Sequence, residues 1–212
     1  MMFSAALAPA ALAGPKPSSA RFSATVAGGV TRLWTASETG ACTSAVRANG
    51  RETLTFRSGG RSTISVARSA KGLVFRGRLT QLAGAFSSIG WSSEEPSPCN
   101  PQGDVSNCVQ PDFAFGSGSL GLQRAAPGRL ALVRFAHEGQ LPGRCLPAEA
   151  AGGEDAPLAS TTGAVDERKL FNRRVKVLTV RGGVQRLVQL AGDAQGQVFE
   201  EVQWTLTLQR LR

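Results

Sequence analysis

The chain has 212 residues, and its four cysteines are the residues whose spacing first suggests chemistry. Cys99 and Cys108 enclose eight residues in a stretch rich in Pro, Ser, Asn and Asp, while Cys42 and Cys145 stand alone. A zinc site needs a tighter grouping such as C-x-x-C, which the sequence lacks, and the only histidine, His137, is eight residues from Cys145. The cysteines therefore predict disulfides formed in an oxidising compartment, with no metal and no cofactor.

The number of cysteines does not fix their pairing, because four cysteines allow three connectivities. A short loop with Pro-rich flanks closes easily, which favours a bridge between Cys99 and Cys108. The second bridge would then join Cys42 to Cys145 and tie an early strand to the middle of the chain. This pairing predicts that residues 91–112 form a long surface loop closed by a disulfide.

Carboxylates and the single histidine are the other candidates for chemistry, and they form no catalytic motif. His137 follows a predicted strand, a position typical of a surface or capping residue. Hydrolysis of a glycosidic bond needs only two carboxylates, which a fold could bring together from anywhere in the chain. A hydrolase of envelope polysaccharide therefore stays open as the alternative function, with no catalytic residue assigned. The acids that could supply such a pair are Glu94, Glu95, Asp104, Asp112, Glu200 and Glu201.

The net charge of +9 and the pI near 10.6 suggest a polyanionic partner. However, 20 of the 24 basic residues are Arg, which the codon usage of a GC-rich genome would also produce. The densest basic cluster lies in "DERKLFNRRVKVLTV", residues 166–180. Two interpretations stay open: a solvated face, or a patch that contacts an anionic polymer. The binding residues that the second interpretation predicts are Arg168, Arg173, Arg174 and Lys176.

Aromatic residues make up 6% of the chain and Tyr is absent, unlike proteins that stack single-stranded nucleic acid on aromatic rings. No nucleic acid is therefore expected as a partner. Trp204 lies in an apolar row and Trp34 has apolar neighbours, so both are predicted to be in the core. Trp91 opens the Pro-rich loop beside Ser and Glu residues, either as a lid on the core or as a ring that faces a ligand such as a sugar.

Apolar and polar residues alternate along most of the chain, which predicts half-buried β-strands. The clearest are in "KGLVFRGRLT" at 71–80 and "EVQWTLTLQR" at 201–210, and one or two helical turns are expected in "AVDERKLFN" at 164–172. Many short strands with Gly-rich turns predict an all-β fold, an antiparallel β-sandwich or barrel of about 8–12 short strands with one long disulfide-closed loop. Further strands are expected at 21–27, 30–36, 53–57, 63–68, 130–135, 175–180 and 184–190.

One internal similarity stands out: "TVAGGVTRL" at 25–33 and "TVRGGVQRL" at 179–187 match at seven of nine positions. Gly-Gly between Val-rich flanks is typical of a tight turn, so each segment is predicted to be a hairpin. Two explanations stay open. Either strands and turns select the same residues independently, or a duplicated hairpin occupies related positions in the first and last thirds of the chain.

The chain begins with "MMFSAALAPAALAGPKP", an apolar run that ends in an A-x-A sequence at 11–13, as signal peptides do before cleavage. No Lys or Arg precedes the run, so the signal is incomplete: either the true start lies upstream, or the run is only an Ala-rich tail. The run is far shorter than the ~20 residues of a membrane-spanning helix. We expect a signal peptide at 1–13, a linker at 14–20 and one β domain at 21–212, in the cell envelope or secreted.

The segments "KLFNRRVKVLTVRGG" at 169–183 and "VQWTLTLQRL" at 202–211, with the export signal, resemble uncharacterised secreted β-rich proteins of high-GC actinobacteria. The resemblance implies a β-sandwich or barrel at or outside the envelope, with no functional residue to carry over. Taken together, the sequence predicts a non-catalytic domain that binds an envelope glycan or anionic polymer through residues 91–112 or 168–176. It indicates no oligomeric state.

Overall fold

The computed structural model describes residues 19–39, 45–138, 144–145, 158, 160–190 and 195–212. The expected signal peptide and Cys42 lie outside the described residues. The described chain contains eleven strands and the short helix α3. These are β1 (Ser19–Thr39), β2 (Ala45–Ser58), β3 (Ser62–Ser69), β4 (Gly72–Arg76), β5 (Arg78–Glu94), β6 (Asp104–Val109), β7 (Phe113–Ala126), β8 (Arg129–Ala136), β9 (Thr162–Ala164), α3 (Glu167–Phe171), β10 (Val177–Gln189) and β11 (Gln195–Arg210).

All eleven strands belong to one antiparallel sheet that closes on itself. Neighbouring strands follow the order β11-β10-β9-β8-β7-β5-β2-β1, and β1 then pairs with β11 to complete the ring. The β3–β4 hairpin pairs with the first residues of β1, and β6 pairs with the last residues of β5. The predicted all-β antiparallel fold is confirmed, and the short helix lies where its sequence indicated.

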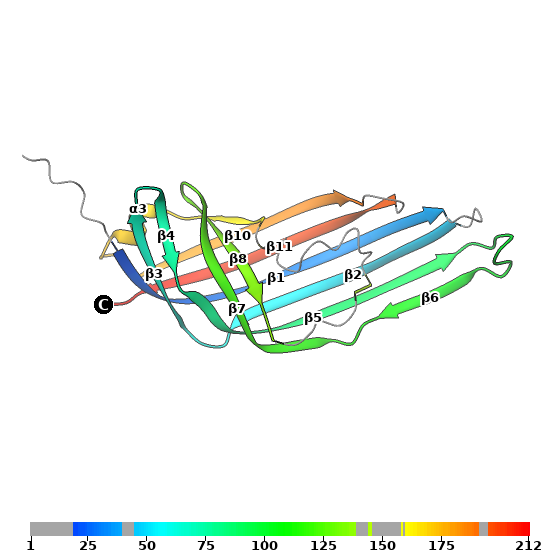
Figure 1. Cartoon of the computed structure of the whole chain (residues 1–212), viewed down its shortest axis with the longest axis horizontal. Helices are drawn as coiled ribbons and strands as arrows, with labels where there is room; N and C mark the ends of the chain where they lie inside the picture. Colours follow the sequence, from blue (N-terminus) through cyan, green and yellow to red (C-terminus); the bar gives the residue numbers. More distant parts are fainter. Residues whose placement is uncertain (1–18, 40–44, 139–143, 146–157, 159, 191–194) are drawn as a thin grey trace, which may run out of the picture.

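Five long strands, β1, β2, β5, β10 and β11, run along the length of the molecule (Figure 1). At one end, β3, β4, β7, β8 and α3 gather beside these strands, and most of the apolar core is formed there. At the other end the long strands continue with β6 beside β5. None of the helices in the described part of the chain has the length and apolar character needed to span a membrane.

Side chains alternate between two faces of the long strands, as the period-two pattern predicted. We call the face that carries Val26, Val30 and Trp34 of β1 the inner face, and the face that carries Thr25, Thr31 and Leu33 the outer face. The inner face is buried: Trp34 is 5% exposed and Trp204 is 2% exposed. Both tryptophans are therefore core residues, as predicted.

The two similar nine-residue segments are not hairpins, and this prediction was wrong. They are uninterrupted parts of β1 and β10 that flank β11 on its two sides. Equivalent residues of the two segments face the same residue of β11 at all nine positions, so that Gly28 and Gly182 both lie opposite Trp204. The strands β1 and β10 are therefore parallel to each other, two strand spacings apart and in equivalent register.

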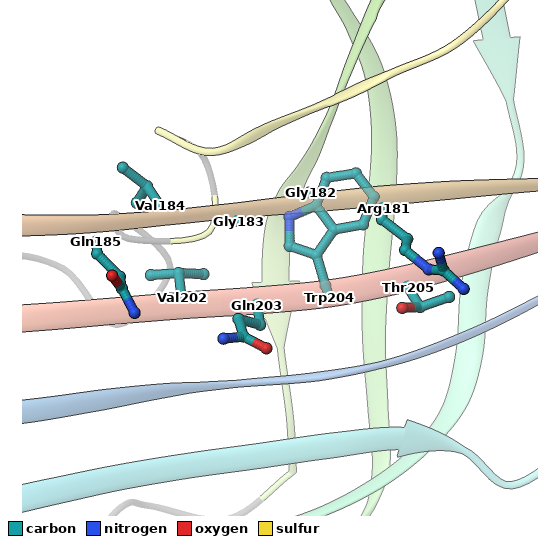
Figure 2. A pocket seen from close by; sticks show the side chains of 9 residues that line it. All are labelled: Arg181, Gly182, Gly183, Val184, Gln185, Val202, Gln203, Trp204 and Thr205. Atoms are coloured by element: carbon teal, nitrogen blue, oxygen red, sulfur yellow. The ribbon is translucent and has the colours of Figure 1, made fainter.

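Trp204 explains why each segment contains glycine at this point. Figure 2 shows its indole lying across Gly182 of the neighbouring strand. A Cβ atom on Gly182 would collide with the six-membered ring, and one on Gly28 would be 2.7 Å from the Cβ atom of Trp204. The indole Nε1 donates a hydrogen bond to Thr161 Oγ1 at 3.0 Å. The first glycine of each Gly-Gly pair therefore marks close packing against a large ring, and not a turn.

Cys108 is bonded to Cys145, so both predicted disulfide pairings were wrong. Cys99 is also disulfide-bonded. The prediction failed because residues 91–112 are not one loop: Ile89–Glu94 of β5 pair with Asp104–Val109 of β6, which fixes Cys108 on a strand opposite Gly90. The backbone N–H of Cys145 donates to Ser88 Oγ at 3.0 Å, so Cys145 is held against the inner face by this hydrogen bond and by the bridge to Cys108.

We predict that Gly182→Ala lowers the free energy of unfolding by about 1–3 kcal/mol, because the added methyl group overpacks the Trp204 site. Gly116→Ala is the matched control, since a Cβ atom there would meet no atom within 4 Å. Chemical denaturation would measure both variants. If Gly182→Ala is equally costly in a Trp204→Ala background, the indole is not the cause.

We predict that replacing Cys108 and Cys145 together by Ser lowers the free energy of unfolding by roughly 4 kcal/mol, the loop-closure value for their separation of 37 residues. Thermal unfolding of the double variant and of the parent would measure the difference. Non-reducing peptide mapping should first give a linked Cys108–Cys145 peptide as the dominant product. A dominant Cys99–Cys108 peptide would contradict the assigned pairing.

Candidate functional site

Two buried carboxylates and a buried guanidinium form a row across the inner face. Glu200 of β11, Arg32 of β1 and Glu52 of β2 lie directly opposite one another in the strand register. Arg32 Nε donates to Glu200 Oε2 at 2.9 Å, and Arg32 Nη1 donates to Glu52 Oε1 at 2.9 Å. The three side chains are at most 6% exposed. Two carboxylates close together are what a hydrolytic site would require.

Two further arginines occupy the remaining carboxylate oxygens of this row. Arg186 of β10 donates to Glu200 Oε1 at 2.7 Å, and Arg144, in the segment after β8, donates to Glu52 Oε2 at 2.7 Å. Every carboxylate oxygen in the row therefore has a guanidinium donor. Because buried charges require such partners, the arrangement is that of a structural ion-pair network, and it offers no carboxylate oxygen to a substrate.

His137, the other candidate for acid–base chemistry, lies among aromatic rings. The centroid of its imidazole is 5.3 Å from the Phe115 ring and 5.7 Å from the rings of Phe113 and Phe135. Its Nδ1 is 3.3 Å from the carbonyl oxygen of Glu138. These contacts are those of a packing residue at the edge of the core.

A basic cleft of about 740 Å³ lies where the beginning of β1 meets the end of β11. Three segments of the chain form it: the start of β1, the connection between α3 and β10, and the last residues of the sequence. Five of its nine lining residues are basic and none is acidic. The lining residues are Ser19, Ala20, Arg21, Arg173, Lys176, Gln209, Arg210, Leu211 and Arg212.

Arg210 holds the connection between α3 and β10 in place beside this cleft. Its Nη2 donates to the carbonyl oxygen of Leu170 at 2.5 Å and its Nε to that of Val175 at 3.2 Å. Its guanidinium carbon lies 4.9 Å from the centroid of the Phe22 ring. Arg210 therefore ties the connection that carries Arg173 and Lys176 to the end of β11.

The other four cations of the cleft are exposed and are not neutralised by neighbours. Within the described part of the chain, Arg21, Arg173, Lys176 and Arg212 make no ion pair, whereas Lys169 of α3 lies 4.0 Å from an Asp166 carboxylate oxygen. Like charges gathered in a concave surface raise the local positive potential. Guanidinium groups can also donate paired hydrogen bonds to carboxylate, sulfate or phosphate oxygens.

The structure places two of the four predicted basic residues in the cleft. Arg173 and Lys176 line it, while Arg168 and Arg174 are exposed but do not. Sequence reasoning missed Arg21, Arg210 and Arg212 because they lie at the other ends of the described chain. Only the pairing of β1 with β11, in which Phe22 lies opposite Arg210, brings them to the same place.

Trp91 lies near the other end of the sheet, on the outer face. It is 39% exposed, and its neighbours across the strands are Asn49 of β2 and Asn107 of β6. Trp91 is therefore not buried as a lid on the core. A ligand-facing role for its ring stays a prediction, separate from the basic cleft.

The chain matches no protein-family model, no curated protein and no solved structure. The comparisons therefore supply no activity, ligand or partner.

We predict that Arg32→Leu lowers the free energy of unfolding by about 3–5 kcal/mol, because Glu52 and Glu200 each lose a partner while they stay buried. Arg47→Leu is the matched control. Arg47 pairs with Glu95 at 3.2 Å on the surface, where the side chains are 71% and 55% exposed, and its removal should cost less than about 1 kcal/mol. Equal effects of the two substitutions on urea unfolding would contradict the structural role of the buried row.

Proposed function

We propose that this protein is a non-catalytic binding protein that holds an anionic envelope polymer through the basic cleft. The observation that carries the proposal is the composition of the cleft: five basic side chains and no acidic one line a volume of about 740 Å³. Such a site attracts negative charge over a distance and releases bound counterions when a polyanion enters.

The disulfides support a location outside the cell, where oxidising conditions preserve them. The anionic polymers found there include acidic polysaccharides, whose carboxylate or sulfate groups match guanidinium donors. We therefore propose both that the protein is secreted and that its ligand is such a polymer. The charge cluster that the sequence indicated at 168–176 contributes Arg173 and Lys176 to the cleft.

The alternative function, hydrolysis with a carboxylate pair, has less support. A hydrolase would need two carboxylates converging on one cavity. No Asp or Glu lines any of the three cavities described here. The two buried carboxylates of the inner face accept five hydrogen bonds from three arginine side chains. Binding is therefore the function that the geometry favours.

We predict that the double reversal Arg173→Glu with Lys176→Glu weakens retention on immobilised heparin, used as an acidic polysaccharide. The salt concentration at elution should fall, and the slope of log affinity against log salt should flatten by about 1–2. The control is Arg61→Glu with Arg129→Glu, which changes the net charge equally at two exposed arginines outside the described cavities.

If both double variants elute together, retention reflects the overall net charge and not the cleft. In that case the proposed site is wrong. Thermal unfolding of each variant would show that the exposed substitutions leave the fold intact.

A further inference from the structure

The basic cleft opens onto the outer face of the three strands β10, β11 and β1. Gln209 lines the cleft and points outward, and the next outward positions along β11 are Thr207, Thr205 and Gln203. Successive outward positions on one strand are about 7 Å apart. Hydroxyl and amide groups therefore lead from the cleft along the outer face.

Two further hollows lie on this continuation. The first, about 410 Å³, is lined by β10 and β11 and includes Arg181, Gln203 and Thr205 (Figure 2). The second, about 540 Å³, is lined by β1, β2, β5 and β7 and includes Arg57 and Thr55. Small outward residues line the two hollows or lie next to them. The small outward residues are Ala27, Gly29, Ala83, Ala85, Ala114 and Gly183.

Arg181 and Arg57 belong to a single row across the sheet. Arg181 lies opposite Thr205, Thr205 opposite Ala27, and Ala27 opposite Arg57. Three strand spacings therefore separate the two arginines, about 14 Å between Cα atoms. Both side chains are exposed and make no ion pair within the part of the chain that the structure describes.

We infer that the basic cleft and the two hollows form one track for a linear acidic polysaccharide, an inference that rests on the proposed function. The cleft holds one part of the polymer, and Arg181 and then Arg57 contact charged groups farther along it. A single small anion cannot reach from the cleft to these arginines. The threonines and Gln203 between the cations provide partners for sugar hydroxyl groups, which a simple chain of phosphates lacks.

Two features of the outer face agree with this occupant. A second copy of the chain would bring further unpaired arginines against Arg57 and Arg181, and like charges repel. Beyond the first hollow, Glu201 accepts hydrogen bonds from Gln185 at 3.0 Å and from Gln203 at 2.6 Å. Its negative charge marks the end of the track in the direction of Phe199.

The length of the bound oligosaccharide is the variable that tests the track. Binding of heparin oligosaccharides from disaccharide to dodecasaccharide would be measured by calorimetry for the parent and for Arg57→Gln with Arg181→Gln. We expect the parent to bind longer chains more tightly. The double variant should bind the disaccharide as the parent does and the longest chain about five- to tenfold more weakly, the scale of two exposed ion contacts. The control is Arg51→Gln with Arg61→Gln, which removes the same charge at two exposed arginines that line none of the three cavities, and it should bind all lengths like the parent.

Three results would overturn the track alone. Equal affinity of the parent for short and long chains would confine binding to the cleft. Equal losses for the Arg51/Arg61 and the Arg57/Arg181 double variants would reduce the effect to net charge. A polyphosphate of matched length with the same dependence on Arg57 and Arg181 would show that the track does not recognise a saccharide. A parent protein that binds no oligosaccharide would overturn the proposed function itself, and the track with it.

Discussion

The fit of the Trp204 ring over glycine fixes the register of β11 against both of its neighbours. Gly182 and Gly28 lie opposite Trp204, and a slip by one residue would put a side chain where the indole lies and turn every inward residue outward. The same register sets Arg32 and Arg186 on either side of Glu200. One steric constraint therefore also places the buried charges, and it accounts for the glycine that β1 and β10 each carry opposite Trp204.

The closure of the sheet determines which face can bind a ligand. The inner face is filled by the apolar core at one end, and by the ion-pair row and the Cys108–Cys145 bridge toward the other. On this face the buried arginines are matched to carboxylates. The outer face and the ends of β1 and β11 carry the unpaired cations instead, including Arg21 and Arg173. A high arginine content alone, as codon usage would produce, does not explain this division between paired and unpaired positions.

The proposed binding surface joins parts of the chain that are far apart in the sequence. Arg21 and Arg210 meet because β1 closes the ring with β11, and Arg173 is held there by the bonds of Arg210 to backbone carbonyls. Arg57 of β2 belongs to the proposed binding surface because β2 is the other neighbour of β1. The site is thus a consequence of ring closure, and the cluster at 168–176 contributes only part of it.

The sequence by itself determined the all-β class, the inward position of Trp34 and Trp204, and the short helix. These features follow from local sequence patterns, above all the alternation of apolar and polar residues along each strand. Tertiary structure alone decided that Gly28 and Gly182 lie within strands, that Cys108 pairs with Cys145, and that Arg21 joins Arg173. Each of these depends on which strand lies beside which. Pairing between distant segments is set by packing and register, and no local pattern contains that information.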